Sequence, residues 1–183
     1  RGEGIIIVSS KDSLPPITNE KFVIQQFIER PLLINGRHKF DVRLYVLVTS
    51  VSPLRVYLHQ YGLARLAPHE YPASSETGLN ISDLSSLTTN VSLNRCDSSF
   101  SMNEHKFSLQ QLYEILEKQG INTNKIISEF ERIVALTMIA AASKIRQYHQ
   151  SHIQHRHTSF ELFGFDILID ESLRCWLMEV NIS

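Results

Sequence analysis

Long apolar runs are missing from this sequence, and so is a strong charge of one sign. No stretch of about 18 consecutive apolar residues occurs, which argues against a membrane-spanning helix. The chain carries 18 lysines and arginines against 19 aspartates and glutamates, for a net charge of −1. This balance supplies no basic field for nucleic acid or an anionic membrane, so we expect neither as a partner.

Cysteine is also scarce. Cys96 and Cys175 lie far apart and follow no metal-binding spacing, a pattern typical of free thiols in a reducing compartment. A Walker-type glycine-rich loop and a serine or cysteine nucleophile elbow are both missing. No secretory signal is recognisable, and the chain begins without Met, so we interpret it as a piece of a longer protein.

What remains is an ordinary globular composition, 43% hydrophobic and 20% charged, in a chain of one domain's length. Apolar and β-branched runs predict strands over residues 4–8, 22–28, 39–49 and 54–60. Asn35-Gly36 predicts a turn between the runs 22–28 and 39–49. Residues 72–107 are rich in Ser, Thr and Asn and lack periodicity, which predicts a long mobile loop.

Two helices and a hairpin are predicted in the second half. Ser108 and Gln111 form a capping-box pattern that begins a helix, and Gly120 ends it. A helical apolar stripe runs through residues 124–149. Strands, then helices, then a final hairpin predict an α+β fold: a largely antiparallel sheet with helices packed on one face.

The final hairpin, FDILIDESLRCWLMEVNIS, carries acids among apolar residues. With strands over 160–170 and 175–180, Asp170 faces Cys175, Leu168 faces Leu177, and Asp166 faces Glu179. Because side chains alternate with period two, the polar set shares one face and the apolar set shares the other. The polar set is Asp166, Glu179 and Asn181; the apolar set is Phe165, Ile167, Ile169, Trp176, Met178 and Val180.

Two carboxylates directly opposite each other repel, and a shared proton, a basic partner or a metal ion relieves the repulsion. Two carboxylates and an amide oxygen suit a hard cation such as Mg²⁺ or Mn²⁺. The alternative is an edge hairpin whose acids simply face water.

A second polar face lies on the strand KFDVRLY, where Lys39, Asp41 and Arg43 alternate with aliphatic residues. Arginine and lysine in such a row suit the binding of carboxylate or phosphate. The alternative is a salt-bridge ladder on a solvated sheet face. Arg65, after the following strand, is a further candidate for this cluster. Together, the two polar faces outline a site for phosphoryl transfer, in which catalysis is mostly positioning and charge neutralisation.

The order of several segments resembles the tubulin–tyrosine ligase-like family over nearly the whole chain. These segments are RGEGI, VIQQFIERPLLINGRHKFDVRLYVLVTS, SLTTNVSLN and FELFGFDILIDESLRCWLMEVNIS. The combination of KFDVRLYVLVTS with GFDILID and EVNIS is the most specific part. The resemblance implies an ATP-grasp architecture and an enzyme that ligates an amino acid to tubulin or a related protein.

The resemblance also implies roles for individual residues. It implies that Mg²⁺ binds Asp166, Glu179 and Asn181. It implies that Lys39, Asp41, Arg43 and Arg65 contact nucleotide, phosphate or amino acid, with Lys39, Arg43 and Arg65 neutralising charge in catalysis. Further nucleotide contacts are implied for Arg1, Gly2, Gln25, Gln26, Phe27, Ile28, Thr89 and Asn90.

The implied reaction uses ATP and proceeds through an acyl phosphate to an amide. Glutamate is the expected amino acid, tubulin or microtubules the expected partner, and the cytoplasmic microtubule cytoskeleton, including the cilium or basal body, the expected location. Leu87, Val91 and Gln26 depart from the family pattern. The alternatives are therefore a glycylase or tyrosine ligase, and a catalytically degenerate member that binds microtubules or nucleotide without turnover.

Overall fold

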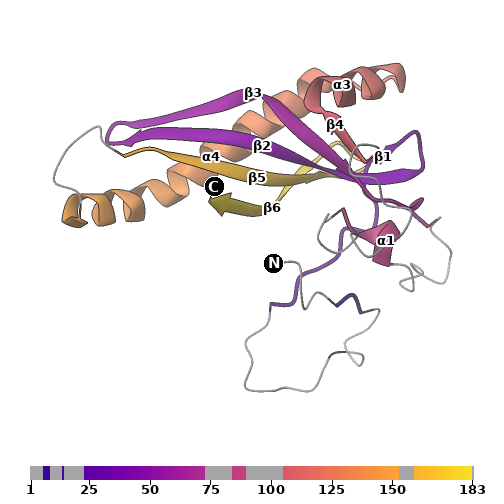
Figure 1. The fold of residues 1–183 in the computed structure, drawn as a ribbon, viewed down its shortest axis with the longest axis horizontal. Helices are drawn as coiled ribbons and strands as arrows, with labels where there is room; N and C mark the ends of the chain where they lie inside the picture. The colour runs from indigo at the N-terminus through magenta and orange to yellow at the C-terminus, as the bar shows by residue number, and fades with distance from the viewer. Residues whose placement is uncertain are drawn as a thin grey trace.

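One antiparallel sheet organises the part of the chain that the computed structural model describes, residues 6–8, 14, 23–72, 84–89, 105–152 and 159–182. The sheet order is β4-β3-β2-β5-β6, and β1 pairs with the beginning of β2 (Figure 1). The elements in chain order are β1 (Leu33–Ile34), β2 (His38–Val51), β3 (Leu54–Leu66), α1 (Leu84–Leu87), β4 (Lys106–Ser108), α3 (Leu109–Lys118), α4 (Thr123–His152), β5 (Glu161–Ile169) and β6 (Cys175–Ile182).

The central strand β2 has the two-sided character that its sequence predicts. Phe40, Val42, Leu44, Val46 and Val48 are buried on one face, and Lys39, Asp41 and Arg43 lie on the other, followed by the partly buried Tyr45 and Leu47. The predicted turn before it is confirmed: Asn35 and Gly36 have positive φ angles of 52° and 66°, and Arg37 N donates to Ile34 O at 3.0 Å.

Helices α3 and α4 cover the aliphatic face of the sheet, and α4 runs diagonally behind it (Figure 1). Ser108 caps α3 through a capping box with Gln111, and Gly120 follows the helix at φ +79°, so both predicted ends are confirmed. The α4 stripe packs on the sheet through Ile126, Phe130, Ile133, Val134 and Met138. The predicted α+β class, with helices on one face of an antiparallel sheet, is confirmed.

Helix α4 has 30 residues, and its exposed positions mix charged side chains such as Arg132 and Lys144 with the apolar Leu136 and Ile139. Among the helices of the described ranges, none is both long and apolar enough to cross a membrane.

Two predicted strands are wrong. Residues 6–8 and 23–28 are described, and neither segment is a strand. Val23 and Ile24 are 91% and 65% exposed, and no described strand pairs with either segment. The apolar composition that predicted these strands favours a sheet only where a neighbouring strand supplies hydrogen bonds and packing.

Only part of the predicted loop over 72–107 is described. It contains the single-turn helix α1, which lies against β2, and the beginning of β4. The remaining residues of the loop lie outside the described ranges, so its mobility stays a prediction.

The final hairpin confirms the central pair and corrects the register between that pair and the turn. Asp166 lies opposite Glu179 as predicted, but Leu168 pairs with Trp176 and Ile169 with Cys175. A β-bulge between Asp166 and Ile167 leaves Met178 as the extra residue, which shifts the register toward the turn by one position.

The bulge places Trp176 on the side of Leu168 and Asp166, so its predicted place on the apolar face is wrong. Its indole Nε1 donates to Asp170 Oδ2 at 2.8 Å, and the Arg174 guanidinium lies 4.2 Å from the ring centroid. Cys175 takes the place next to Ile169 in the core, where it is 6% exposed. Met178 and Val180 are about two-fifths exposed, at 42% and 38%.

Phe130→Ala should lower the free energy of unfolding of this domain by about 3–5 kcal/mol, because the ring is 1% exposed and its loss leaves a cavity. Leu136→Ala, on the same helix and 53% exposed, is the matched control and should cost less than about 0.5 kcal/mol. Urea unfolding of the full-length variants measures both. Equal losses would contradict the packing of α4 on the sheet.

Candidate functional site

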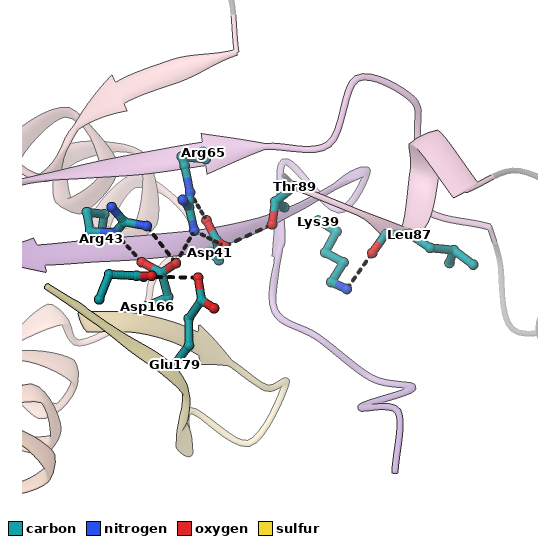
Figure 2. Close-up of polar contacts among 9 residues, drawn as sticks. Lys39, Asp41, Arg43, Arg65, Leu87, Thr89, Asp166 and Glu179 are labelled. Atoms are coloured by element: carbon teal, nitrogen blue, oxygen red, sulfur yellow. Dashed lines mark hydrogen bonds and ion pairs between the residues drawn. The ribbon is translucent and has the colours of Figure 1, made fainter. Parts of the chain in front are cut away.

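The candidate site lies on the face of the sheet opposite α3 and α4. We call it the polar face and define it by Lys39, Asp41, Arg43, Arg65, Asp166 and Glu179, which come from four adjacent strands (Figure 2). The structure therefore brings together the two polar patterns that the sequence shows separately. Arg65 lies within β3 rather than after it, because that strand extends to Leu66 instead of ending near residue 60.

Arg43 and Asp166 form a two-pronged ion pair between β2 and β5. They are directly opposite each other in the antiparallel ladder. Arg43 Nε donates to Asp166 Oδ1, and Arg43 Nη2 donates to Asp166 Oδ2 at 2.8 Å (Figure 2). Both carboxylate oxygens are engaged, so the pair fixes the orientation of each partner.

Arg65 joins this pair to Asp41. Its Nε donates to Asp41 Oδ1 at 2.7 Å and its Nη2 to Asp41 Oδ2 at 2.5 Å, and Nη2 also lies 2.9 Å from Asp166 Oδ2. The four side chains form an alternating row, Arg43–Asp166–Arg65–Asp41 (Figure 2). Thr89 Oγ1 donates to Asp41 Oδ2 at 2.9 Å and so ties the segment after α1 to the row.

The row keeps Asp166 ionised although it is only 3% exposed. Burial alone disfavours the charged carboxylate, but the hydrogen bond from Arg43 and the charge of Arg65 outweigh it, and the net pKa of Asp166 is lowered. The hydrogen bond to Asp166 raises the pKa of Arg43. Although burial opposes the charge of Arg65, its bonds to Asp41 raise its pKa.

Lys39 has a different environment. It is 9% exposed, its Nζ donates to the backbone oxygen of Leu87 at 2.6 Å, and it lies 4.7 Å from the centroid of the Phe27 ring. Burial lowers its pKa to about 8, and the nearby charge of Asp41 offsets only part of that effect. Lys39 therefore contributes a partly desolvated ammonium group at the α1 end of the polar face.

The three predicted metal ligands lie on adjacent strands. Glu179 is opposite Asp166, and Asn181 Nδ2 donates to Glu179 Oε1 at 3.0 Å. In Figure 2, the Glu179 carboxylate points toward Asp166 and Asp41. In the described ranges, no three His, Cys, Asp or Glu side chains are arranged so that they could hold a metal ion, and the third member of the predicted set is an amide.

The donor chemistry of this set nevertheless fits Mg²⁺. Asp166 accepts two hydrogen bonds from Arg43 and lies in ion-pair contact with Arg65, which uses three of roughly four acceptor positions on a carboxylate. One position on Asp166 Oδ1 remains for another partner. Together with the Glu179 carboxylate and the Asn181 amide oxygen, it gives an all-oxygen set of the kind that Mg²⁺ prefers.

The other predicted nucleotide contacts are only partly described. Gln25 and Gln26 are exposed, while Phe27 and Ile28 are half-buried, and Phe27 contacts Lys39. Thr89 contacts Asp41. Arg1, Gly2 and Asn90 lie outside the described residues.

Sequence reasoning missed one partner in the site, the carbonyl of Leu87. The sequence marks Leu87 only as a departure from a family pattern, whereas its side chain is 1% exposed and its backbone oxygen holds Lys39. A backbone acceptor leaves no side-chain signal, so only the placement of α1 reveals it.

Curated relatives of this chain are named as tubulin-modifying enzymes. A tubulin polyglutamylase, ttll-4 of Caenorhabditis briggsae, is 38% identical over 186 residues, which cover 100% of this chain and 30% of the relative. A probable beta-tubulin polyglutamylase of Tetrahymena thermophila is 34% identical, over 99% of this chain and 16% of the relative. The tubulin monoglutamylase TTLL4 of Homo sapiens is 34% identical, over 100% of this chain and 15% of the relative.

The chain thus spans less than a third of the length of each of these relatives. At the level of the family, the match is to the Tubulin-tyrosine ligase family and covers residues 1–183. Because this match extends over the whole sequence, the chain belongs to the tubulin-tyrosine ligase family.

Proposed function

We propose that this chain is part of an ATP-dependent ligase that joins glutamate to a carboxylate of tubulin. The observation that carries the proposal is the alternating row Arg43–Asp166–Arg65–Asp41 beside Glu179 and Lys39. This arrangement supports the proposal because the cations would bind anionic groups beside oxygen atoms that would suit Mg²⁺. The names of the relatives, a tubulin polyglutamylase and a tubulin monoglutamylase, support glutamate as the amino acid and tubulin as the acceptor.

The cations would bind the anionic groups of the substrates. Arg43 and Arg65 carry planar guanidinium groups that match phosphate and carboxylate oxygens, and a substrate would exchange with Asp166 and Asp41, which hold their paired donors in this structure. Lys39 offers a point charge at the α1 end of the same face, next to Phe27. Each is half-buried or buried, so its interaction with an anion is less screened by water than at an exposed site.

Asp166, Glu179 and Asn181 are the residues that would hold Mg²⁺. When bound, Mg²⁺ would neutralise phosphate charge and orient the phosphates for transfer. Arg43 and Arg65 keep Asp166 ionised, which a ligand for a hard cation requires.

In the proposed reaction, an oxygen of the acceptor carboxylate attacks the γ-phosphorus of ATP, and the bond from that phosphorus to the ADP oxygen breaks. The product is an acyl phosphate. The amino group of glutamate then attacks the acyl carbon, loses a proton, and displaces inorganic phosphate to leave an amide. Arg43, Arg65 and Lys39 would stabilise the negative charge that develops on the transferred oxygens and orient both substrates.

Glutamate is proposed over glycine and tyrosine because the relatives reported above are named as polyglutamylases or a monoglutamylase. Nothing in the polar face by itself selects the side chain of the incoming amino acid. A single experiment therefore has to identify the amino acid and distinguish an enzyme that turns over from a protein that only binds.

Glu179→Gln should lower ATP-dependent incorporation of labelled glutamate into microtubules by roughly 100-fold, because it removes one carboxylate from the predicted Mg²⁺ ligands and keeps the side-chain shape. The full-length protein is assayed with labelled glutamate, glycine and tyrosine in parallel. Glu171→Gln removes the same charge from an exposed turn residue that pairs with Arg30, and should leave incorporation unchanged.

Incorporation of glycine or tyrosine instead would redirect the proposal to another amino acid. No incorporation of any of the three, with microtubule binding intact, would overturn it in favour of a binding protein without turnover.

Lys39→Met should abolish most of this activity and yet stabilise the fold. Lowering the pKa of a lysine from 10.5 to about 8 costs roughly 3 kcal/mol of folding free energy while the group is charged, and Met removes that cost. The unfolded chain binds the proton more tightly, so the stability of the wild type should rise as pH increases from about 8 to 10.5.

Thermal unfolding of the full-length protein between pH 7 and pH 10.5 measures this difference. The gap in stability between Lys39→Met and the wild type should be largest at or below pH 8 and shrink above it. Lys144→Met, an exposed position on α4, is the control and should show no such pH-dependent gap. A gap that stays constant with pH would contradict the buried, charged state of Lys39.

A further inference from the structure

Gly164 lies on β5 in the middle of the polar face. It pairs with Tyr45 of β2 on one side and with Asn181 of β6 on the other, and Asp166 is two residues further along the same face. Its φ angle lies outside the left-handed region, so its backbone conformation does not itself require glycine. Conformational freedom therefore does not account for this glycine.

The space above Gly164 is filled by the side chain of Arg43. A Cβ atom at position 164 would lie 3.0 Å from Arg43 Cδ and 3.3 Å from both Arg43 Nε and Nη1. Nε is one of the two atoms that donate to Asp166. Since contacts of 3.0–3.4 Å are tighter than nine in ten Cβ contacts in proteins, the Arg43 side chain would have to give way by a few tenths of an ångström.

Arg43 has little freedom to move while keeping its partner. Its guanidinium holds both oxygens of Asp166, which is nearly fully buried, and any tilt that relieves Nε and Nη1 also changes the two-pronged geometry. An added methyl group at position 164 would therefore act on the ion pair rather than on the hydrophobic core.

The other described glycines differ in what an added Cβ would meet. Gly36 and Gly120 have positive φ angles and open space around them. At Gly62 on β3, the Cβ would lie 2.7 Å from the backbone oxygen of Arg43, so the obstacle is the strand itself. Within the described part of the chain, Gly164 is thus the glycine whose missing side chain makes room for a side chain of the polar face.

We propose that Gly164 is a positioning residue: it leaves the gap in which the Arg43 side chain lies across β5 to reach Asp166. The gap itself is independent of what the protein does. Its consequence for catalysis rests on the proposed function, because a shifted Arg43 would aim its donors less accurately at the phosphate or carboxylate of a substrate and would hold Asp166 less well, leaving more of that contact to Arg65.

The first test is a cycle of thermal unfolding temperatures in the full-length protein, with Gly164→Ala, Arg43→Ala and both together. Gly164→Ala alone should lower the unfolding temperature by about 2–4 °C. In the Arg43→Ala background the Arg43 side chain no longer obstructs a Cβ atom at position 164. Gly164→Ala should then leave the unfolding temperature unchanged or raise it, because alanine loses less conformational entropy than glycine when a strand forms.

Gly62→Ala is the matched control for this cycle. Its obstacle is a backbone atom of Arg43, so its cost should persist when the Arg43 side chain is removed. An equal cost of Gly164→Ala with and without the Arg43 side chain would overturn the proposal. If Arg43→Ala does not fold because Asp166 loses its partner, Arg43→Ala with Asp166→Asn serves as the background, with the same expected reversal of sign.

The second test is the glutamate incorporation assay. Gly164→Ala should lower turnover by about 10–100-fold, and adding it to Arg43→Ala should lower turnover no further. If the turnover losses of the two single variants multiply in the double variant, Gly164 acts independently of Arg43, and this result would overturn the positioning role. If the wild type incorporates no amino acid, the proposed function fails, while the temperature cycle still decides whether Gly164 makes room for Arg43.

Discussion

A buried, ionised carboxylate at Asp166 is the constraint on which the polar face depends. An unpaired charge in this position would cost several kcal/mol, so a fold that buries Asp166 has to bring cations to it. Arg43 arrives from β2 and Arg65 from β3, and both reach Asp166 only while these strands keep their register with β5. The ion pairs of the site and the pairing of the strands therefore depend on the same register.

The alternation of β2 links that requirement to the hydrophobic core. Val42 and Leu44 are buried beneath the helices, and Arg43 between them points to the opposite face. A slip of one residue would bury the charges and expose the aliphatic side chains, so the packing of α3 and α4 also holds the register of the site. A change in the core far from Arg43 can thus disturb the polar face without touching it.

The sequence was informative wherever a local pattern decides the structure. The alternation of β2, the capping box at Ser108 and the opposition of Asp166 and Glu179 all follow from spacing, and the structure confirms them. Prediction failed where distant partners decide. The bulge that makes Met178 the extra residue moves Trp176 to the other face, and residues 23–28 have strand-like composition without a strand beside them.

The extent of β3 failed for a related reason. Two register irregularities interrupt its pairing with β2, one of them between the Leu44–Gly62 and Val46–Leu58 pairs, so alternation in the sequence breaks off before the strand ends. From the sequence alone, Arg65 is therefore expected to follow the strand, whereas it is the side chain that joins Asp41 to Asp166.

The polar face holds three cations, Lys39, Arg43 and Arg65, against three anions, Asp41, Asp166 and Glu179. With formal charges that cancel, this surface exerts little long-range attraction, so the rate at which an anionic substrate associates should depend only weakly on ionic strength, and binding would proceed by exchange of hydrogen-bond partners after contact.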